Sequence, residues 1–229
     1  MARPLFQLGP RLALCAEMVR EGRLLCDVGT DHAYLPIWLL KSGRIPGALA
    51  CDINPGPLEA AAGNARKYGE EHRLILRLSD GLQEVRPEEA EDIVVAGMGG
   101  KLMLRIIEET RWLTDAEKRL VLQPMSSVEE LRLGLKRLGF SVLEERAVED
   151  SGKVYSAFAA AYIGAEPETD QLYPYLGKLK PGESAVRLYG EKVLRELRGR
   201  LEGALRGRGQ ETPEQLRKII GQIEARYLK

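Results

Sequence analysis

Short apolar segments alternate with longer amphipathic segments between residues 24 and about 163, and this alternation constrains the fold more than any other feature. The apolar, strand-like segments comprise residues 24–28, 47–52, 74–78, 93–96, 120–122, 141–147 and 154–162. The helix-like segments between them comprise residues 34–42, 57–68, 101–109 and 128–138. Such alternation predicts a parallel sheet that is covered by helices on both faces. Only "VEDSGK" separates the last two strand-like segments, which predicts an antiparallel pair.

The C-terminal region has a different character. The stretch "GAEPETDQLYPYLGKLKPGES" is rich in proline, glycine and acidic residues, which predicts a linker. Beyond it, leucines recur at helical spacing at positions 194, 197, 201 and 205, and a second apolar stripe spans residues 216–227. Thr212 begins a capping-box arrangement with proline at the first helical position of that second stripe. We therefore predict two domains, residues 1–165 and residues 166–229, the second an antiparallel helical hairpin of coiled-coil type.

Composition narrows the setting. Thirty-four basic residues balance thirty-four acidic ones, so the overall charge does not argue for nucleic acid and does not exclude a local basic surface. Cys15, Cys26 and Cys51 form no CxxC pair, which suits thiols in a reducing cytosol. No run approaches the ~20 apolar residues of a membrane helix. We expect a cytoplasmic protein that has no membrane or metal partner and acts as a monomer.

The densest polar motif, "CDVGTDHAYLP" at residues 26–36, follows the first strand-like segment. Ligands of open parallel sheets bind beyond the carboxyl ends of the strands. A dinucleotide site there requires G-x-G-x-x-G, but the second and third glycine places, counted from Gly29, hold Asp31 and Tyr34. A carboxylate repels a pyrophosphate, and a tyrosine blocks its close approach. The motif therefore argues against a nicotinamide dinucleotide.

S-adenosylmethionine suits this motif better, because it has no phosphate and carries a cationic sulfonium and a cationic ammonium. We expect Asp27 or Asp31 to bind the ammonium and Gly29 to allow close backbone approach, although Asp31 could instead cap the following helix. Five parallel strands closed by an antiparallel pair also fit a seven-stranded methyltransferase sheet better than a six-stranded dinucleotide fold. The predicted cofactor site comprises Asp27, Gly29, Thr30, Asp31, Asp52, Ile53, Asp80, Gly81, Gly97 and Met98.

Two further acids follow the next two strand-like segments. Asp52 lies 23 residues after Gly29, near the distance at which an acid reaches ribose hydroxyls. Asp80, in "LSDG", could accept a hydrogen bond from the adenine amino group. Either residue alone could be an ordinary turn acid. Acids after three successive parallel strands together predict a ligand site more specifically than any one of them.

The fourth strand-like segment leads into "AGMGGKLM" at residues 96–103. Gly97, Gly99 and Gly100 leave the backbone around Met98 bare, so a flat group could approach and main-chain carbonyls could receive an exocyclic amine. The alternative is a flexible loop before a helix. Gln123, in "LQPM", follows the fifth segment and could bind either a base edge or a neighbouring loop.

The motifs "CDVGTDHAYLP", "DINPGP", "LSDGL", "DIVVAGMGGKLM" and "LVLQPM", in this order, resemble the bacterial tRNA (adenine-N1)-methyltransferase family that acts on position 22 of tRNA, the TrmK family. The resemblance runs through roughly residues 5–163, and the tail resembles the family's small coiled-coil domain. Members usually have Glu near the second strand, where this chain has Asp52. The resemblance implies an α/β fold with a Rossmann-like class I methyltransferase sheet, S-adenosylmethionine as donor and tRNA as acceptor.

N1 lies on the Watson–Crick edge of adenine, so the target base must be unpaired or flipped into the site. Tyr34 could stack on the base or pack the first helix onto the sheet, and Asp31 or His32 could assist the proton balance of the cationic product. The predicted catalytic residues are Asp31, His32, Tyr34, Met98, Gly99 and Gly100, and the predicted substrate-binding residues are Tyr34, Gln123, Arg195 and Arg198.

Residues 187–208 include seven basic residues and three acidic ones. This basic excess could bind phosphates, or it could simply form a solvent-exposed helix face. The alternatives to tRNA methylation are a methyltransferase that acts on another RNA or a small molecule, and a non-catalytic RNA-binding module on the same fold.

Overall fold

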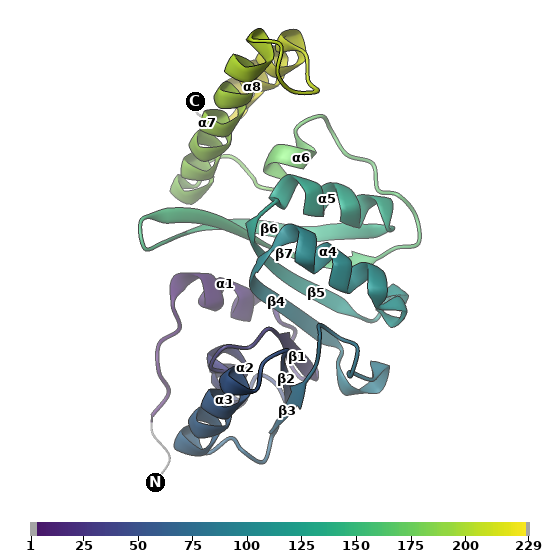
Figure 1. Ribbon diagram of the computed structural model, residues 1–229. Helices are drawn as coiled ribbons and strands as arrows, with labels where there is room; N and C mark the ends of the chain where they lie inside the picture. The colour runs from purple at the N-terminus through teal and green to yellow at the C-terminus, as the bar shows by residue number, and fades with distance from the viewer. Residues whose placement is uncertain (1–3, 228–229) are drawn as a thin grey trace.

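A seven-stranded sheet organises residues 4–227, the part of the chain that the computed structural model describes (Figure 1). Its strand order is β3-β2-β1-β4-β5-β7-β6. The strands are β1 (Leu25–Val28), β2 (Ala48–Asp52), β3 (Leu74–Leu78), β4 (Asp92–Gly99), β5 (Arg119–Ser126), β6 (Phe140–Asp150) and β7 (Lys153–Tyr162). The first five are parallel, and β7 lies antiparallel between β5 and β6. The predicted sheet and its closing antiparallel pair are confirmed.

Helices cover both faces of this sheet. Successive strand residues point to opposite faces, so Leu25 enters one apolar core and Cys26 the other. The first core also contains residues of α1 (Pro10–Met18), α2 (Tyr34–Lys41) and α3 (Pro55–Tyr68). The second contains residues of α4 (Gly100–Glu109) and α5 (Val128–Arg137). Short 3₁₀ turns, η1 (Pro87–Glu89) and η2 (Arg111–Thr114), precede β4 and β5.

Helix α1 was not among the predicted elements. It begins after Gly9 with a proline in its first turn and buries four residues, namely Leu14, Cys15, Ala16 and Met18. It packs against α2 and β4, but its most extensive contacts are with β5, β6 and β7, which come more than a hundred residues later in the chain. Because these partners are remote in sequence, the short apolar stretch gave no local indication of where it would pack.

Strands β4 and β5 extend beyond their predicted ends. Met98 pairs with Pro124 and Gly99 with Ser126, with register shifts on both sides of Met98. Glycine and proline usually weaken or end strands, and here a bulge accommodates them. Helix α4 begins directly at Gly100. The alternative of a flexible loop after Ala96 is therefore wrong: the glycines belong to a paired strand end.

The C-terminal region forms the predicted helical hairpin, which consists of α7 (Ser184–Leu205) and α8 (Pro213–Tyr227). The capping box is present: the Gln215 amide N–H donates to Thr212 Oγ1 at 3.2 Å, and the Thr212 amide N–H donates to Gln215 Oε1 at 3.0 Å. Leu197, Leu216 and Ile223 are among the side chains buried between the two helices. The hairpin projects past the β6–β7 end of the sheet (Figure 1).

The segment predicted as a linker is partly packed. It contains the short helix α6 (Tyr173–Leu176), and its buried apolar residues are Leu172, Tyr173, Leu176 and Leu179. Most of these join an apolar cluster that also contains Val154 of β7 and the helical hairpin. The apolar residues of this segment outweigh its proline, glycine and acidic residues once they meet β7 and α7.

A buried polar network ties the helical hairpin to the sheet. Arg132 of α5 and Glu145 of β6 form an ion pair with fully buried side chains. Arg132 also donates to the Pro174 and Tyr175 carbonyls at 2.9 Å and contacts the Tyr189 hydroxyl of α7 at 3.3 Å. The other oxygen of Glu145 accepts the Lys178 amide N–H at 2.9 Å. We call these contacts the junction network.

Among the helices of residues 4–227, none combines the length and apolarity that a membrane crossing requires.

Candidate functional site

The loop after β1 is held to β2 by its backbone. The amide N–H groups of Gly29 and Thr30 both donate to the Cys51 carbonyl, at 2.8 and 2.9 Å. Gly29 has a φ of +75°, which favours glycine. The Thr30 hydroxyl donates to the Asp27 carboxylate at 2.6 Å. The loop is thus a well-defined turn with Asp27 beneath it.

Asp27 is a buried acid without a basic partner. The residue is only 7% exposed, and within residues 4–227 no cationic side chain pairs with its carboxylate. Burial raises the pKa of Asp27 to about 6, against the lowering effect of the Thr30 hydrogen bond. A buried carboxylate of this kind is stabilised by a positively charged ligand. Asp27 therefore fits the ammonium of S-adenosylmethionine.

The β1 loop meets the end of β4 at Gly29. A Cβ atom added to Gly29 would lie 1.9 Å from the Met98 methyl carbon Cε, so a side chain there would displace Met98. The sequence predicted both residues for the cofactor site, and the structure brings them into contact. This contact places the β1 loop directly beside the glycine-rich segment at residues 96–103 that a flat group was predicted to approach.

Asp31, His32 and Tyr34 lie together at the open side of the β1 loop. The Asp31 side chain is 80% exposed and its Oδ2 lies 3.3 Å from His32 Nε2. The His32 and Tyr34 rings are 5.4 Å apart, and Tyr34 also packs edge-on against Phe6 at 5.3 Å. Helix α2 begins after Ala33 without a side-chain cap, so the structure does not support the capping alternative for Asp31. Tyr34 packs on Phe6, which precedes α1, and stays 38% exposed, and its stacking on a base stays a prediction.

Asp52 is the last residue of β2 and Asp80 follows β3, so both lie at the carboxyl ends of neighbouring parallel strands. Asp52 Oδ1 accepts the Asn54 amide N–H at 2.8 Å and so shapes the start of α3, and the neighbouring Ile53 side chain is exposed. Asp80 instead forms a two-bond ion pair with Arg105 of α4, at 2.8 and 3.2 Å. The Arg105 hydrogen bonds lower the pKa of Asp80. An adenine amino group would share Asp80 with Arg105, a residue that was not among those predicted for the site.

Of the three glycines near Met98, only Gly97 faces open space. A Cβ on Gly97 would meet no atom within 4 Å, whereas one on Gly99 would lie 3.2 Å from Ser126 Oγ. A Cβ on Gly100 would lie 2.4 Å from the Ser127 carbonyl oxygen, and Gly100 is buried. Gly100 thus allows α4 to pack on the β5–α5 loop. Gly81, predicted for the cofactor site, similarly packs against Ile106.

The contacts of Gln123 favour the prediction that it binds a neighbouring loop over the prediction that it binds a base edge. Its residue is 1% exposed, and its Oε1 accepts the Gly97 amide N–H at 3.2 Å and an Arg11 N–H at 3.3 Å. Its amide nitrogen donates to the Pro124 carbonyl at 3.1 Å. The side chain is therefore bonded to neighbouring protein groups and does not project toward a base.

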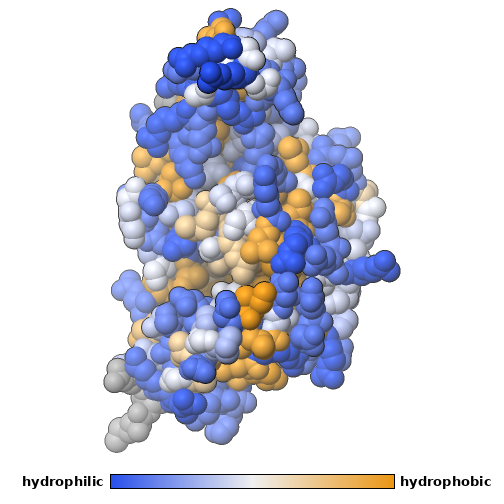
Figure 2. All heavy atoms as spheres, in the orientation of Figure 1, coloured by the Kyte–Doolittle hydropathy of each residue, from blue (hydrophilic) through white to orange (hydrophobic). Residues whose placement is uncertain are grey.

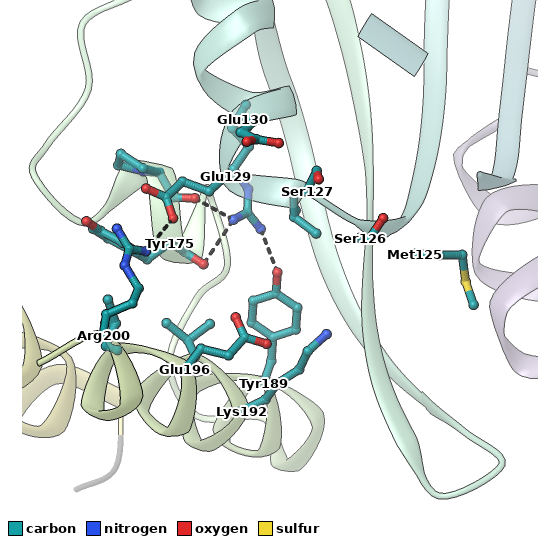
Figure 3. A pocket seen from close by; sticks show the side chains of 15 residues that line it. Met125, Ser126, Ser127, Glu129, Glu130, Tyr175, Tyr189, Lys192, Glu196 and Arg200 are labelled. Atoms are coloured by element: carbon teal, nitrogen blue, oxygen red, sulfur yellow. Dashed lines mark hydrogen bonds and ion pairs between the residues drawn. The ribbon is translucent and has the colours of Figure 1, made fainter. Parts of the chain in front are cut away.

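Two cavities lie between the sheet and the helical hairpin, and both border Met125 at the end of β5. One, of about 550 Å³, is lined by residues that include Ser127, Glu129, Tyr175, Tyr189, Lys192 and Arg200 (Figure 3). The other, of about 520 Å³, is lined by residues that include Lys153, Tyr155, Lys192 and Arg195. The sequence could not indicate these cavities, because their walls come from segments far apart in the chain.

The two arginines predicted to bind substrate differ in their contacts. Arg195 lines the second cavity, whereas Arg198 lies on the exposed side of α7 and pairs with Glu224 of α8 at 2.7 Å. Hydrophilic residues dominate the projecting end of the helical hairpin (Figure 2). In the described part of the chain, no three His, Cys, Asp or Glu side chains are grouped to hold a metal ion.

Comparisons with known proteins agree with this geometry. A family described as "Methyltransferase domain" matches residues 8–158. The tRNA (adenine(22)-N(1))-methyltransferase of Bacillus subtilis is 32% identical over 76% of each chain. The solved structure of Sp1610 from Streptococcus pneumoniae in complex with S-adenosyl-L-methionine has a TM-score of 0.80 at 30% identity and covers 94% of this chain and 97% of its own. That of Bacillus subtilis TrmK has a TM-score of 0.79 at 26% identity, with 96% and 97% covered. The chain belongs to the bacterial tRNA (adenine(22)-N(1))-methyltransferase family.

Proposed function

We propose that this protein transfers a methyl group from S-adenosylmethionine to N1 of adenine 22 in tRNA. One observation carries the proposal. The buried Asp27 carboxylate, which has no cationic partner within residues 4–227, lies in the turn that contains Gly29. Gly29 contacts Met98 at the end of β4, where the neighbouring Gly97 borders open space. A site for a cationic donor and a site for a flat acceptor are thus neighbours. Membership in the family supports the same reaction.

Each residue at this edge of the sheet binds a different part of the donor. Asp27 binds the ammonium of the donor, and Gly29 and Thr30 line its backbone side. Asp52, at the end of β2, binds the ribose hydroxyls, with the exposed Ile53 beside it for an apolar ring face. The Asp80–Arg105 pair, just after β3, lies at the part of the site that would bind the adenine amino group.

The acceptor reacts as a neutral nucleophile. When bound, S-adenosylmethionine supplies an electrophilic methyl group on a cationic sulfur. The N1 lone pair attacks the methyl carbon, the carbon–sulfur bond breaks, and the positive charge passes from sulfur to the adenine ring. Alignment of N1 with the methyl carbon makes the main contribution to lowering the activation barrier, on the order of 7–11 kcal/mol at best. The exposed carboxylate of Asp31, which lies beside His32, can stabilise that charge.

The target base must leave its stack to reach the donor. The exposed face of Tyr34, with His32 beside it, offers a stacking surface. The open backbone at Gly97 leaves room for a flat ring, and its carbonyls can accept the exocyclic amine next to N1. Lys153, Lys192 and Arg195, around the second cavity, lie where the remaining tRNA phosphates could bind.

We also propose that a single copy acts, because Asp27, Gly97 and the helical hairpin all come from one chain. A sedimentation experiment should report the mass of one chain. The cytoplasm suits the three free, buried cysteines, since thiols stay reduced there.

Methylation of unmodified tRNA transcripts with isotope-labelled S-adenosylmethionine tests the function. The expected product is 1-methyladenosine at position 22, mapped by nuclease digestion and mass spectrometry. A transcript with guanine at position 22 is the matched control and should take no label. Label on another nucleotide, or equal labelling of the control, would refute the assignment.

A further inference from the structure

Gly97 is the extra residue of the bulge at the end of β4. Ala96 pairs with Gln123 and Met98 pairs with Pro124, so no β5 residue stands opposite Gly97. Its φ of +78° is a conformation that favours glycine. The Gly97 amide N–H therefore has no ladder partner, and the Gln123 side-chain oxygen accepts it at 3.2 Å.

Arg11 of α1 holds Gln123 in this orientation. Its Nη1 donates to the same Gln123 oxygen at 3.3 Å, and its Nε donates to Asp150 at the β6–β7 turn at 2.8 Å. The guanidinium also lies 5.1 Å from the centre of the Tyr155 ring. Two donors on one oxygen decide which end of the Gln123 amide faces Gly97, because the amide nitrogen cannot accept a hydrogen bond.

We propose that Arg11 and Gln123 are positioning residues for methyl transfer, which act by holding the Gly97 bulge. The bulge directs Met98 toward Gly29 and leaves the Gly97 backbone open to the acceptor base. Gln123 is 1% exposed, so we assign its effect to the hydrogen bond with Gly97 and not to contact with the base. This inference rests on the proposed methyl transfer and assigns a chain of contacts from Asp150 through Arg11 and Gln123 to the bulge.

The first test removes each member of the chain. Arg11→Met and Gln123→Leu should each lower kcat on tRNA about 10- to 100-fold, since a displacement on the order of 1 Å can cost this much. The KM for tRNA and the dissociation constant for S-adenosylmethionine should change less than the turnover. Gln123→Glu retains an acceptor oxygen for both donors and should recover most of the activity. Because the two residues act through one contact, the double variant should lose little more than either single variant.

Glu17→Gln is the matched control. Glu17 of α1 pairs with Arg146 of β6, so this pair also ties α1 to the β6–β7 pair but does not reach Gln123. The control should keep the unaltered kcat. An equal loss in Glu17→Gln and Arg11→Met would overturn the inference, because it would assign the effect to the docking of α1 alone.

Hydrogen exchange of the Gly97 amide gives a readout that does not depend on activity. Glycine-labelled protein should show faster exchange at Gly97 in Arg11→Met and Gln123→Leu than in Glu17→Gln. An unchanged Gly97 amide, or unchanged turnover, in the two positioning variants would refute the inference. If the unaltered protein methylates no tRNA while Gly97 responds as expected, the proposed function fails and the structural link from Arg11 to the bulge stands.

Discussion

The β1 loop and the junction network both concentrate charged side chains, but they use them in opposite ways. In the junction network, Arg132 and Glu145 are fully buried, and each has further protein partners on α6, α7 or the segment between them. At the β1 loop, Asp27 is buried with one hydroxyl partner, and Asp31 is 80% exposed. The first region pairs its buried charges with each other, whereas the second keeps the buried Asp27 carboxylate, which has no cationic partner within residues 4–227.

The difference separates architecture from binding. A buried ion pair whose two charges neutralise each other contributes to the position of the helical hairpin and does not attract a charged ligand. A buried carboxylate without a cation keeps an unfavourable free energy that a cationic ligand relieves. Changes in the junction network should therefore alter stability first, and changes at the β1 loop should alter ligand affinity or turnover first.

Breaking the junction pair should have the largest effect. Glu145→Ala leaves the buried Arg132 guanidinium without its anion, and we expect a loss of about 3–5 kcal/mol in the free energy of unfolding. Urea denaturation measures this loss. Arg132→Met combined with Glu145→Leu removes both charges and should restore more than half of it. A single variant within about 1 kcal/mol of the unaltered protein would contradict the structural role of the pair.

Gly29→Ala should weaken S-adenosylmethionine binding at least about tenfold, because the new Cβ would collide with Met98 and the φ is positive. Isothermal titration measures this affinity. Gly43→Ala is the matched control, since Gly43 has a φ of +74° and open space around it. It should cost about 1–2 kcal/mol of stability without changing the affinity. Equal affinities for the two variants would show that the Met98 contact is unimportant.

The affinity for S-adenosylmethionine should depend on pH through Asp27. Burial raises the pKa of Asp27 to about 6, so the carboxylate is ionised above that pH and protonated below it. A cationic ligand prefers the ionised form, and affinity should therefore fall as pH falls, to about one tenth at pH 5 relative to pH 8. Titrations across this range, with proton release measured in two buffers, test the effect. The Asp27→Asn variant should bind weakly and without this dependence.

His32→Ala should have the smallest effect of the four. The side chain is 45% exposed and contacts Asp31 and Tyr34, so it borders the acceptor side of the site. We expect a fall in kcat of about 3- to 10-fold, below the ~100-fold or more of an obligatory acid or base. The dissociation constant for S-adenosylmethionine should stay within about twofold. Unchanged turnover would remove His32 from the mechanism.

Elements with local signals were predictable from the sequence. The seven strands, the helices α2 to α5 and the helical hairpin follow from apolar periodicity and turn residues, and the capping box at Thr212 is present. The location of Asp27, Asp52 and Asp80 near the carboxyl ends of three neighbouring strands follows because parallel strands end on the same side.

Features that depend on remote partners were not predictable. Helix α1 and its Arg11 contacts involve residues more than a hundred positions away. The bulge that keeps Gly97 within β4 depends on the register of β5. The packing of the apolar residues at 172–179 depends on β7 and α7, which outweigh a local composition typical of a linker.

The order of strands and helices along the chain, and the presence of an acid at or just past the carboxyl end of each of the first three strands, follow from the sequence alone. Which of those acids has a cation beside it depends on the folded chain: Asp80 pairs with Arg105, and Asp27 accepts a hydrogen bond from the Thr30 hydroxyl. The reason is physical. Periodicity and turns are properties of neighbouring residues, whereas the electrostatic state of a carboxylate depends on what the folded chain brings within a few ångströms of it.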